Sequence, residues 1–139
     1  MKYTLLLLFF FSQALAFAHS PAASKLQALN LKPLEQTQAD RSDSSYLKLQ
    51  DEAVDALTNA VAEAVKNPQD EILIDEIFRV SIVLLNTDPY QYAGEILVPL
   101  YQKQQNLFLK HLKKFSTKDA QRIKEAVKAA ERTLRRGNG

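Results

Sequence analysis

Apolar residues recur at helical spacing from residue 45 onward, and this pattern predicts a domain made of helices. In residues 45–66, one apolar stripe runs along an otherwise acidic segment and consists of Leu47, Val54, Leu57, Val61 and Ala64. Residues 68–86 are apolar nearly all round, which is typical of a buried central helix. Asn67-Pro68 separates the two segments, because asparagine caps a helix and proline suits its first position.

Two further helices are predicted in the second half of the chain. Residues 89–115 form the third, and Pro99 inside it should kink or split it, because proline lacks the N–H that the carbonyl four residues earlier needs. Ser116 begins the fourth, since a serine followed three residues later by Asp119 resembles a capping box. The apolar stripe of this helix comprises Ala120, Ile123, Val127, Ala130 and Leu134. Short connections favour antiparallel neighbours, so the expected fold is a small, all-α, antiparallel four-helix bundle-like domain.

The first 18 residues have the form of a secretory signal peptide. A positive charge, an apolar run and small residues before a cleavage point follow in order: Lys2, Leu5–Phe11, Ala16 and Ala18. The apolar run is shorter than the roughly 20 residues of a membrane span. We therefore expect cleavage after Ala18, with Ala14-Leu15-Ala16 as a second possible site, and an exported mature chain without a transmembrane segment.

Residues 19–44 are polar and aperiodic, and this composition predicts a flexible arm. The expected organisation is thus a signal peptide over 1–18, an arm over 19–44 and a helical domain over 45–139. The 139-residue chain contains no cysteine, which excludes a disulfide framework, a thiolate metal site and a cysteine nucleophile. A small exported domain held by packing alone fits a bacterial periplasmic protein better than a eukaryotic secreted module, and the expected location is periplasmic or extracellular.

No pattern in the sequence predicts catalysis or a bound cofactor. A glycine-rich phosphate loop, a zinc-protease motif, a calcium loop and a nucleophile elbow are all missing from it. Asp75, Glu76 and Arg79 interrupt the most apolar helix and offer acid–base chemistry in principle. Because no nucleophile or histidine stands near them in sequence, an ion pair between Asp75 and Arg79 on a solvated stripe is the favoured interpretation.

Charge is distributed unevenly along the chain. Residues 19–100 carry 6 basic and 13 acidic residues, whereas residues 101–139 carry 11 basic and 3 acidic residues. On the predicted fourth helix, the basic residues lie opposite the apolar stripe: Lys118, Arg122, Lys124, Lys128, Arg132, Arg135 and Arg136. This face predicts an anionic partner, either an acidic protein, lipid headgroups or a polyanion. The alternative is a solvated face, or one screened by acidic helices of the same fold. Nucleic acid is disfavoured, because no aromatic ladder accompanies the basic residues.

Two smaller groups of residues are candidate binding sites. Tyr90, Tyr92 and Tyr101 flank Pro99 together with Glu95, and exposed tyrosines are frequent anchors at protein interfaces. The alternative is that these rings close the end of the bundle. Cleavage after Ala18 would make His19 the first residue, and its amine and ring could bind Cu(II) together with His111.

The sequence as a whole favours an exported, non-catalytic protein-binding or accessory module whose protein partner is unidentified. The first alternative is a peripheral binder of anionic surfaces that uses the basic face of the last helix. The second alternative is a copper-binding protein that uses the N-terminal histidine.

Overall fold

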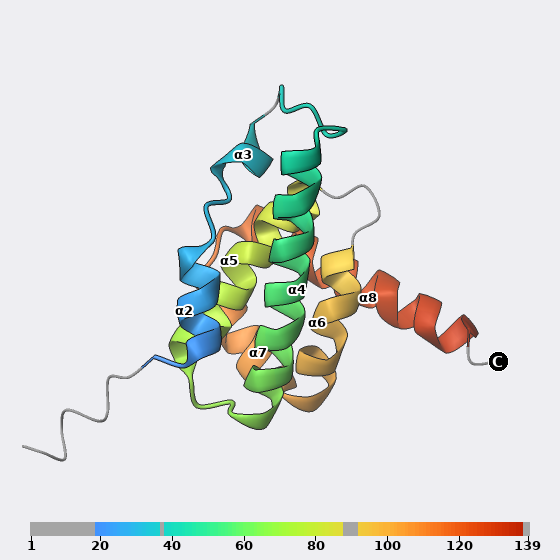
Figure 1. Cartoon of the computed structure of the whole chain (residues 1–139). Coiled ribbons are helices and arrows are strands. Elements are labelled where there is room, and N and C mark those ends of the chain that lie inside the picture. Colours follow the sequence, from blue (N-terminus) through green and yellow to red (C-terminus); the bar gives the residue numbers. More distant parts are fainter. Residues whose placement is uncertain (1–18, 37, 88–91, 138–139) are drawn as a thin grey trace, which may run out of the picture.

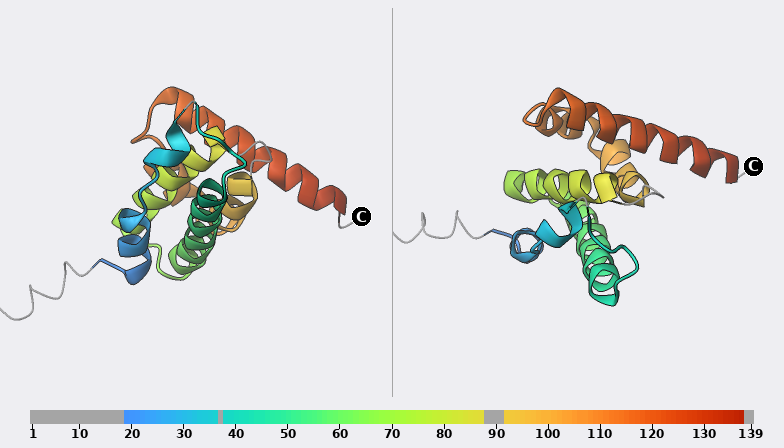
Figure 2. Two further views of the ribbon diagram at one scale, coloured as in Figure 1. Left: turned by 45° about the horizontal axis from the view of Figure 1, so that its top comes forward. Right: turned by 90° about the horizontal axis from the view of Figure 1, so that it is seen from above.

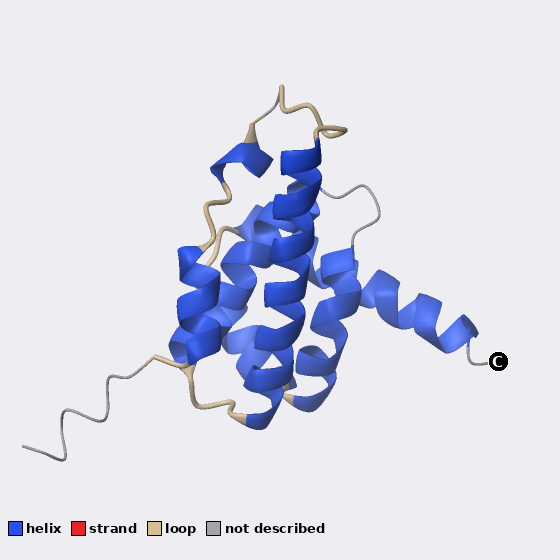
Figure 3. Cartoon of the chain, in the orientation of Figure 1, coloured by secondary structure: helices blue, strands red, loops and turns tan. Residues whose placement is uncertain are grey.

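The computed structural model describes residues 19–36, 38–87 and 92–137, and every regular element in these ranges is a helix (Figure 3). The helices are α2 (Pro21–Ala28), α3 (Lys32–Glu35), α4 (Ser44–Lys66), α5 (Glu71–Thr87), α6 (Tyr92–Lys103), α7 (Gln105–Leu112) and α8 (Thr117–Gly137). The expectation of an all-α, bundle-like domain is confirmed. None of the described helices combines the length and the apolarity that crossing a membrane requires.

Helix α5 forms the centre of the domain and contacts every other described helix. In the right view of Figure 2, α8 lies on one side of α5, and α4 and α2 lie on the other. This position follows from the sequence of α5, which is apolar nearly all round and buries Leu73, Ile77, Phe78 and Leu84 among others. Helix α6 contacts both α4 and α8 and so connects the two outer layers.

The prediction of a flexible arm over residues 19–44 is wrong for the segment that forms α2 and α3. Ser20 caps α2, because its hydroxyl accepts a hydrogen bond from the N–H of Ala23 at 3.1 Å. Leu26 and Leu34 are buried in the main core. Such short helices are marginal in isolation, and packing against α4 and α5 stabilises them (Figure 1).

Two polar contacts join α2 to α5. The guanidinium of Arg79 donates a hydrogen bond to the carbonyl of Leu26 at 2.8 Å, where α2 is about to end. The N–H of Ser20 donates to Asp70 at 3.4 Å, and Asp70 also accepts from the N–H of Leu73 at 3.0 Å. Asp70 is therefore the residue that caps α5, and this helix begins at Glu71, three residues later than the predicted Pro68.

The buried face of α4 is richer in alanine than the predicted stripe. Ala53, Ala56, Ala60 and Ala64 are buried together with Leu57 and Val61, while Leu47 is 45% exposed. Leu47 was predicted to be buried and is not, because its neighbour Tyr46 lies on the buried face of α4 and Leu47 is turned about 100° away from that face. Small side chains on this face let α4 approach α5 and α6 closely.

The predicted third helix is divided, but not at Pro99. Helix α6 continues through Pro99 to Lys103, and the interruption lies at Gln104, whose backbone angles are φ −134° and ψ 45°. Pro99 is exposed, so water can reach the backbone carbonyl that its missing N–H leaves without a donor. The interruption is local, since the N–H of Gln104 still donates to Leu100 at 2.9 Å.

Helices α6 and α8 meet backbone to backbone at Gly94. A Cβ atom on Gly94 would lie 2.8 Å from the carbonyl oxygen of Ala126 and 2.9 Å from its carbonyl carbon. Only glycine allows this approach without a shift of one helix. Gly94 therefore sets the distance between α8 and the rest of the domain.

Candidate functional site

Helix α8 extends beyond the body of the domain at its C-terminal end (Figure 1). It starts at the predicted capping box, where the hydroxyl of Ser116 accepts from the N–H of Asp119 at 3.1 Å and donates to its carboxylate at 2.7 Å. Its inner face is buried as far as Ala130. Leu134, which was predicted to be buried, is 47% exposed, because the last two turns extend past the helices that cover the inner face.

All seven predicted basic residues of α8 are exposed, but one of them has a structural role. The guanidinium of Arg122 donates to the carbonyl of Leu85 at 2.7 Å and to the side chain of Asn86 at 2.6 Å. It thereby satisfies polar groups at the C-terminal end of α5. Within the described ranges, no carboxylate forms an ion pair with the others, namely Lys118, Lys124, Lys128, Arg132, Arg135 and Arg136.

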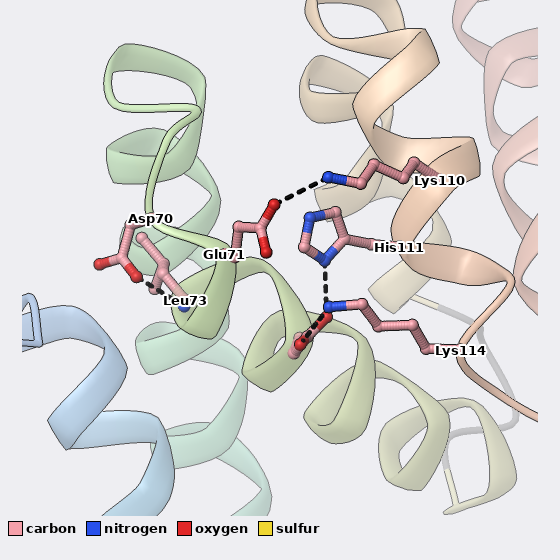
Figure 4. Close-up of polar contacts among 7 residues, drawn as sticks. Asp70, Glu71, Leu73, Lys110, His111 and Lys114 are labelled. Carbon is pink, nitrogen blue, oxygen red and sulfur yellow. Dashed lines mark hydrogen bonds and ion pairs between the residues drawn. The ribbon is translucent and has the colours of Figure 1, made fainter.

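The acidic residues of α5 instead form ion pairs with lysines of α7 and of the connection that follows it. Glu71 pairs with Lys110 at 2.8 Å (Figure 4). Asp75 pairs with Lys114 at 2.8 Å. Arg79 pairs with Glu76 at 2.7 Å, so the predicted Asp75–Arg79 pair is wrong. The acidic helix α5 therefore screens the lysines at and just after α7. The cationic side chains of α8 other than Arg122 form no ion pair with the described residues.

His111 and Asp75 form a buried polar contact that sequence reasoning did not find. The His111 ring is completely buried, and its Nδ1 lies 2.6 Å from Asp75 Oδ1. Partial burial raises the pKa of the Asp75 carboxyl, but the hydrogen bonds and charges of Lys114 and His111 lower it more, so that it ends below its ordinary value. Asp75 is therefore ionised at neutral pH and fixes the orientation of the imidazole.

The second nitrogen of His111 has no access to a substrate. Its Nε2 is enclosed by the protein and has no hydrogen-bond partner within the described chain. An imidazole that acts as a general base must reach the proton that it removes. The His111–Asp75 contact is thus a structural link between α5 and α7.

A hollow of about 230 Å³ lies between α7 and α8, beside the end of α6. Tyr101, Phe108, Leu109 and Val127 form its apolar part, and Lys124 and Lys128 provide its charged part. The ring of Tyr101 stands edge-on to Phe108 with centroids 5.2 Å apart, and its hydroxyl accepts a hydrogen bond from Gln105 at 2.8 Å. These contacts fix the wall of the hollow that faces α8.

The predicted tyrosine patch is not gathered on one face. Tyr92 and Tyr101 are nine residues apart on α6, which at about 100° per residue places them on opposite sides of the helix. Tyr92 is 51% exposed and Glu95 is exposed near it, while Tyr101 is half-buried against Phe108. Tyr90 lies outside the described residues.

The two histidines of the copper hypothesis occupy different environments. His19 is exposed just before α2, and His111 is buried against Asp75. A site that used both rings would require His111 to leave the core. Among the described residues, no group of three or more histidine, cysteine, aspartate or glutamate side chains is placed to hold a metal ion.

A second hollow, of about 510 Å³, lies between the α3–α4 connection and the start of α4. Its two carboxylates are already engaged, because Asp40 accepts hydrogen bonds from Ser42 and Asp43 accepts one from Ser45. These bonds hold the pKa of both carboxyls below the ordinary value. The acidic groups here stabilise the turn that leads into α4, so the exposed face of α8 is the stronger candidate site.

Comparison with protein families, with curated proteins and with solved structures found no match.

Proposed function

We propose that this chain is an exported, non-catalytic protein-binding module that holds an acidic protein partner on the exposed face of α8. The observation that carries the proposal is a projecting helix whose cationic side chains lack ion-pair partners in the described chain. Like charges at i,i+4, such as Lys124 with Lys128 and Arg132 with Arg136, destabilise a helix slightly. Carboxylates of a partner would remove this repulsion and be steered toward the face.

The burial of α8 favours a protein partner over a lipid bilayer. An interfacial helix binds a membrane by inserting its apolar face, but Ile123, Val127 and Ala130 are buried inside this domain. Leu134 alone of the predicted stripe is substantially exposed. Contact with a bilayer would therefore be mainly electrostatic, with Leu134 as the one exposed apolar side chain of this stripe.

Binding to anionic surfaces is the second candidate, because Arg132, Arg135 and Arg136 are exposed at the projecting end of α8. Sedimentation with phosphatidylglycerol vesicles tests it, with phosphatidylcholine vesicles as the control. Binding that disappears on Arg135→Glu and Arg136→Glu, and that weakens as salt shortens the screening length to about 8 Å, would support it.

Export is part of the proposal and rests on the signal-peptide pattern of residues 1–18, which lie outside the described residues. Cleavage after Ala18 would leave every described helix intact, since α2 starts at Pro21. Sequencing the N-terminus of the protein purified from its own cells should give His19 as the first residue. A chain that retains Met1 would contradict export by cleavage.

Site-directed crosslinking tests the protein-binding proposal. Because the chain has no cysteine, one introduced cysteine provides one attachment point for a photoactivatable crosslinker. Ala129→Cys places it on the exposed side of α8 without removing a charge, and Asn59→Cys places it on α4 as the matched control. In extracts of its own cells, we expect one defined adduct from the α8 position and none from the α4 position.

Charge reversal completes this experiment. Adding Lys128→Glu and Arg132→Glu to the Ala129→Cys chain should abolish the adduct, because the partner's carboxylates would then be repelled. Identical adducts from both cysteine positions, or an adduct that survives the reversal, would contradict the proposal.

A further inference from the structure

We infer that the hollow between α7 and α8 is an anchor pocket for a single apolar side chain of an acidic peptide segment. This inference rests on the proposed function and specifies the chemistry of the partner. The segment would place a leucine or phenylalanine against Leu109 and Tyr101, which are half-buried, above Phe108 and Val127, which are buried at the base of the hollow. Its carboxylates would lie along Lys124 and Lys128.

The size of the hollow suits one side chain. Pockets that enclose a cofactor or a drug-sized molecule have volumes of about 300–1,000 Å³. The hollow is about 230 Å³ and is open to solvent along one side, so it does not enclose a ligand of that size. Its aromatic and aliphatic lining matches the small concave pockets that receive anchor residues at protein interfaces.

The charges around the hollow select an acidic segment. Lys124 and Lys128 line it, both are exposed, and neither forms an ion pair in the described chain. A second depression continues from Lys128 along α8 and is lined also by Glu131, Arg132 and Arg135. The carboxylate of Glu131 accepts a hydrogen bond from Gln102 at 3.1 Å, so the one acidic group there is already engaged. The two depressions share Lys128, so the apolar hollow and the cationic depression lie next to each other, and together they are called the track.

The track distinguishes a peptide from a flat anionic surface. A bilayer can meet the outward arginines, but its headgroup plane cannot follow a hollow that lies between two helices. An extended peptide can place one side chain in the hollow while its neighbours contact the lysines.

Peptide binding measured by fluorescence anisotropy tests the inference. The probes are a labelled peptide of glutamates with one central leucine and the same peptide with alanine in place of leucine. We expect the leucine peptide to bind about tenfold more tightly, since burying a leucine side chain in a half-open pocket corresponds to about that factor. Equal affinities would overturn the inference.

Three variants separate the contribution of the hollow to peptide binding from that of the lysine charges. Leu109→Gln puts a polar group in the hollow and should reduce the binding of the leucine peptide about tenfold, with no effect on the alanine peptide. Leu107→Gln, on the same helix but outside the hollow, is the matched control and should change neither. Lys128→Gln should weaken both peptides. Circular dichroism checks that each variant retains its helical content.

The outcomes distinguish the inference from the proposed function. If Lys128→Gln weakens both peptides but Leu109→Gln changes neither, the anchor pocket is wrong and the acidic-partner proposal stands. If Lys128→Gln changes neither peptide, both are wrong. If phosphatidylglycerol vesicles displace the leucine peptide and Leu109→Gln is without effect, a lipid surface replaces the peptide as the partner.

A measurement on the unaltered protein guards against variants that fail to fold. Methyl resonances of Leu109 and Val127 should shift on titration with the leucine peptide and remain in place with the alanine peptide. Shifts confined to the lysine-rich face with both peptides would overturn the anchor pocket.

Discussion

Replacing Gly94 by alanine should destabilise the protein, although the same change stabilises most helices. Alanine is favoured over glycine in a helix by up to about 1 kcal/mol. At Gly94, however, the new Cβ would lie 2.8 Å from the carbonyl oxygen and 2.9 Å from the carbonyl carbon of Ala126. Because both of these atoms are backbone, no side-chain rotation can relieve the overlap.

The free-energy cost of the overlap can be compared with the gain in helix propensity. Non-bonded carbon atoms rest at about 3.5–4.0 Å, so α6 and α8 would have to separate by several tenths of an ångström or more. Overpacking of this kind costs about 1–3 kcal/mol, and contact with rigid backbone places Gly94→Ala in the upper part of that range. After subtraction of the helix-propensity gain, we expect a net loss of about 2 kcal/mol in the free energy of unfolding.

Urea denaturation followed by circular dichroism measures this loss. With a slope of about 1–3 kcal/mol per molar urea, the midpoint should fall by about 1 M. Gly137→Ala is the control, since a Cβ there meets no atom within 4 Å, and it should leave the midpoint unchanged or raise it slightly. A Gly94→Ala protein more stable than the wild type would refute the close contact of α6 with α8.

Three further substitutions test the packing described above. Leu26→Ala should lower the free energy of unfolding, measured by urea denaturation, by about 2–5 kcal/mol, because Leu26 of α2 is buried in the core. A change below about 0.5 kcal/mol would instead support a flexible arm. Arg122→Met should cost about 1–2 kcal/mol in the same assay through the loss of its bonds to Leu85 and Asn86. Asp75→Asn should cost about 1–2 kcal/mol at pH 7. The pKa of Asp75 is lower in the folded protein than in the unfolded chain. The ionised carboxylate therefore stabilises the fold above its ordinary pKa near 4, and this stabilisation is lost as pH falls through the folded-state pKa. A stability difference between Asp75→Asn and wild type that stays constant between pH 7 and pH 2 would contradict the role of the ionised carboxylate.

The local patterns of the sequence were sufficient to predict the principal helices. The nearly continuous apolar sequence of α5 predicts its central position, and the Ser116 capping box predicts the start of α8. Helix α2 also starts with such a signal, because Ser20-Pro21 is again a cap followed by proline. The polar, aperiodic composition of residues 19–44 predicts an arm instead, because eight residues form no stable helix alone and the packing that stabilises them comes from α4 and α5.

The features that define the candidate site depend on residues far apart in the chain. The hollow needs Phe108 of α7 to face Val127 of α8, and the buried link needs Asp75 to meet His111 across 36 positions. Helical spacing identifies which residues share a face but not which helix that face meets. The basic face of α8 was predicted from spacing alone, whereas the contact of Arg122 with α5 required the fold.

The projection of α8 implies a gradient of local stability along one helix. Amides near Ile123 lie in the core and should exchange with deuterium only when the whole domain unfolds. Amides of the last two turns have few tertiary contacts and like-charged neighbours at Arg132 and Arg136, so they should exchange through fraying. A partner that neutralises these arginines would slow the exchange of amides that it does not touch. Part of the binding free energy would then be spent on ordering the end of the helix, so the complex would form with modest affinity and dissociate readily.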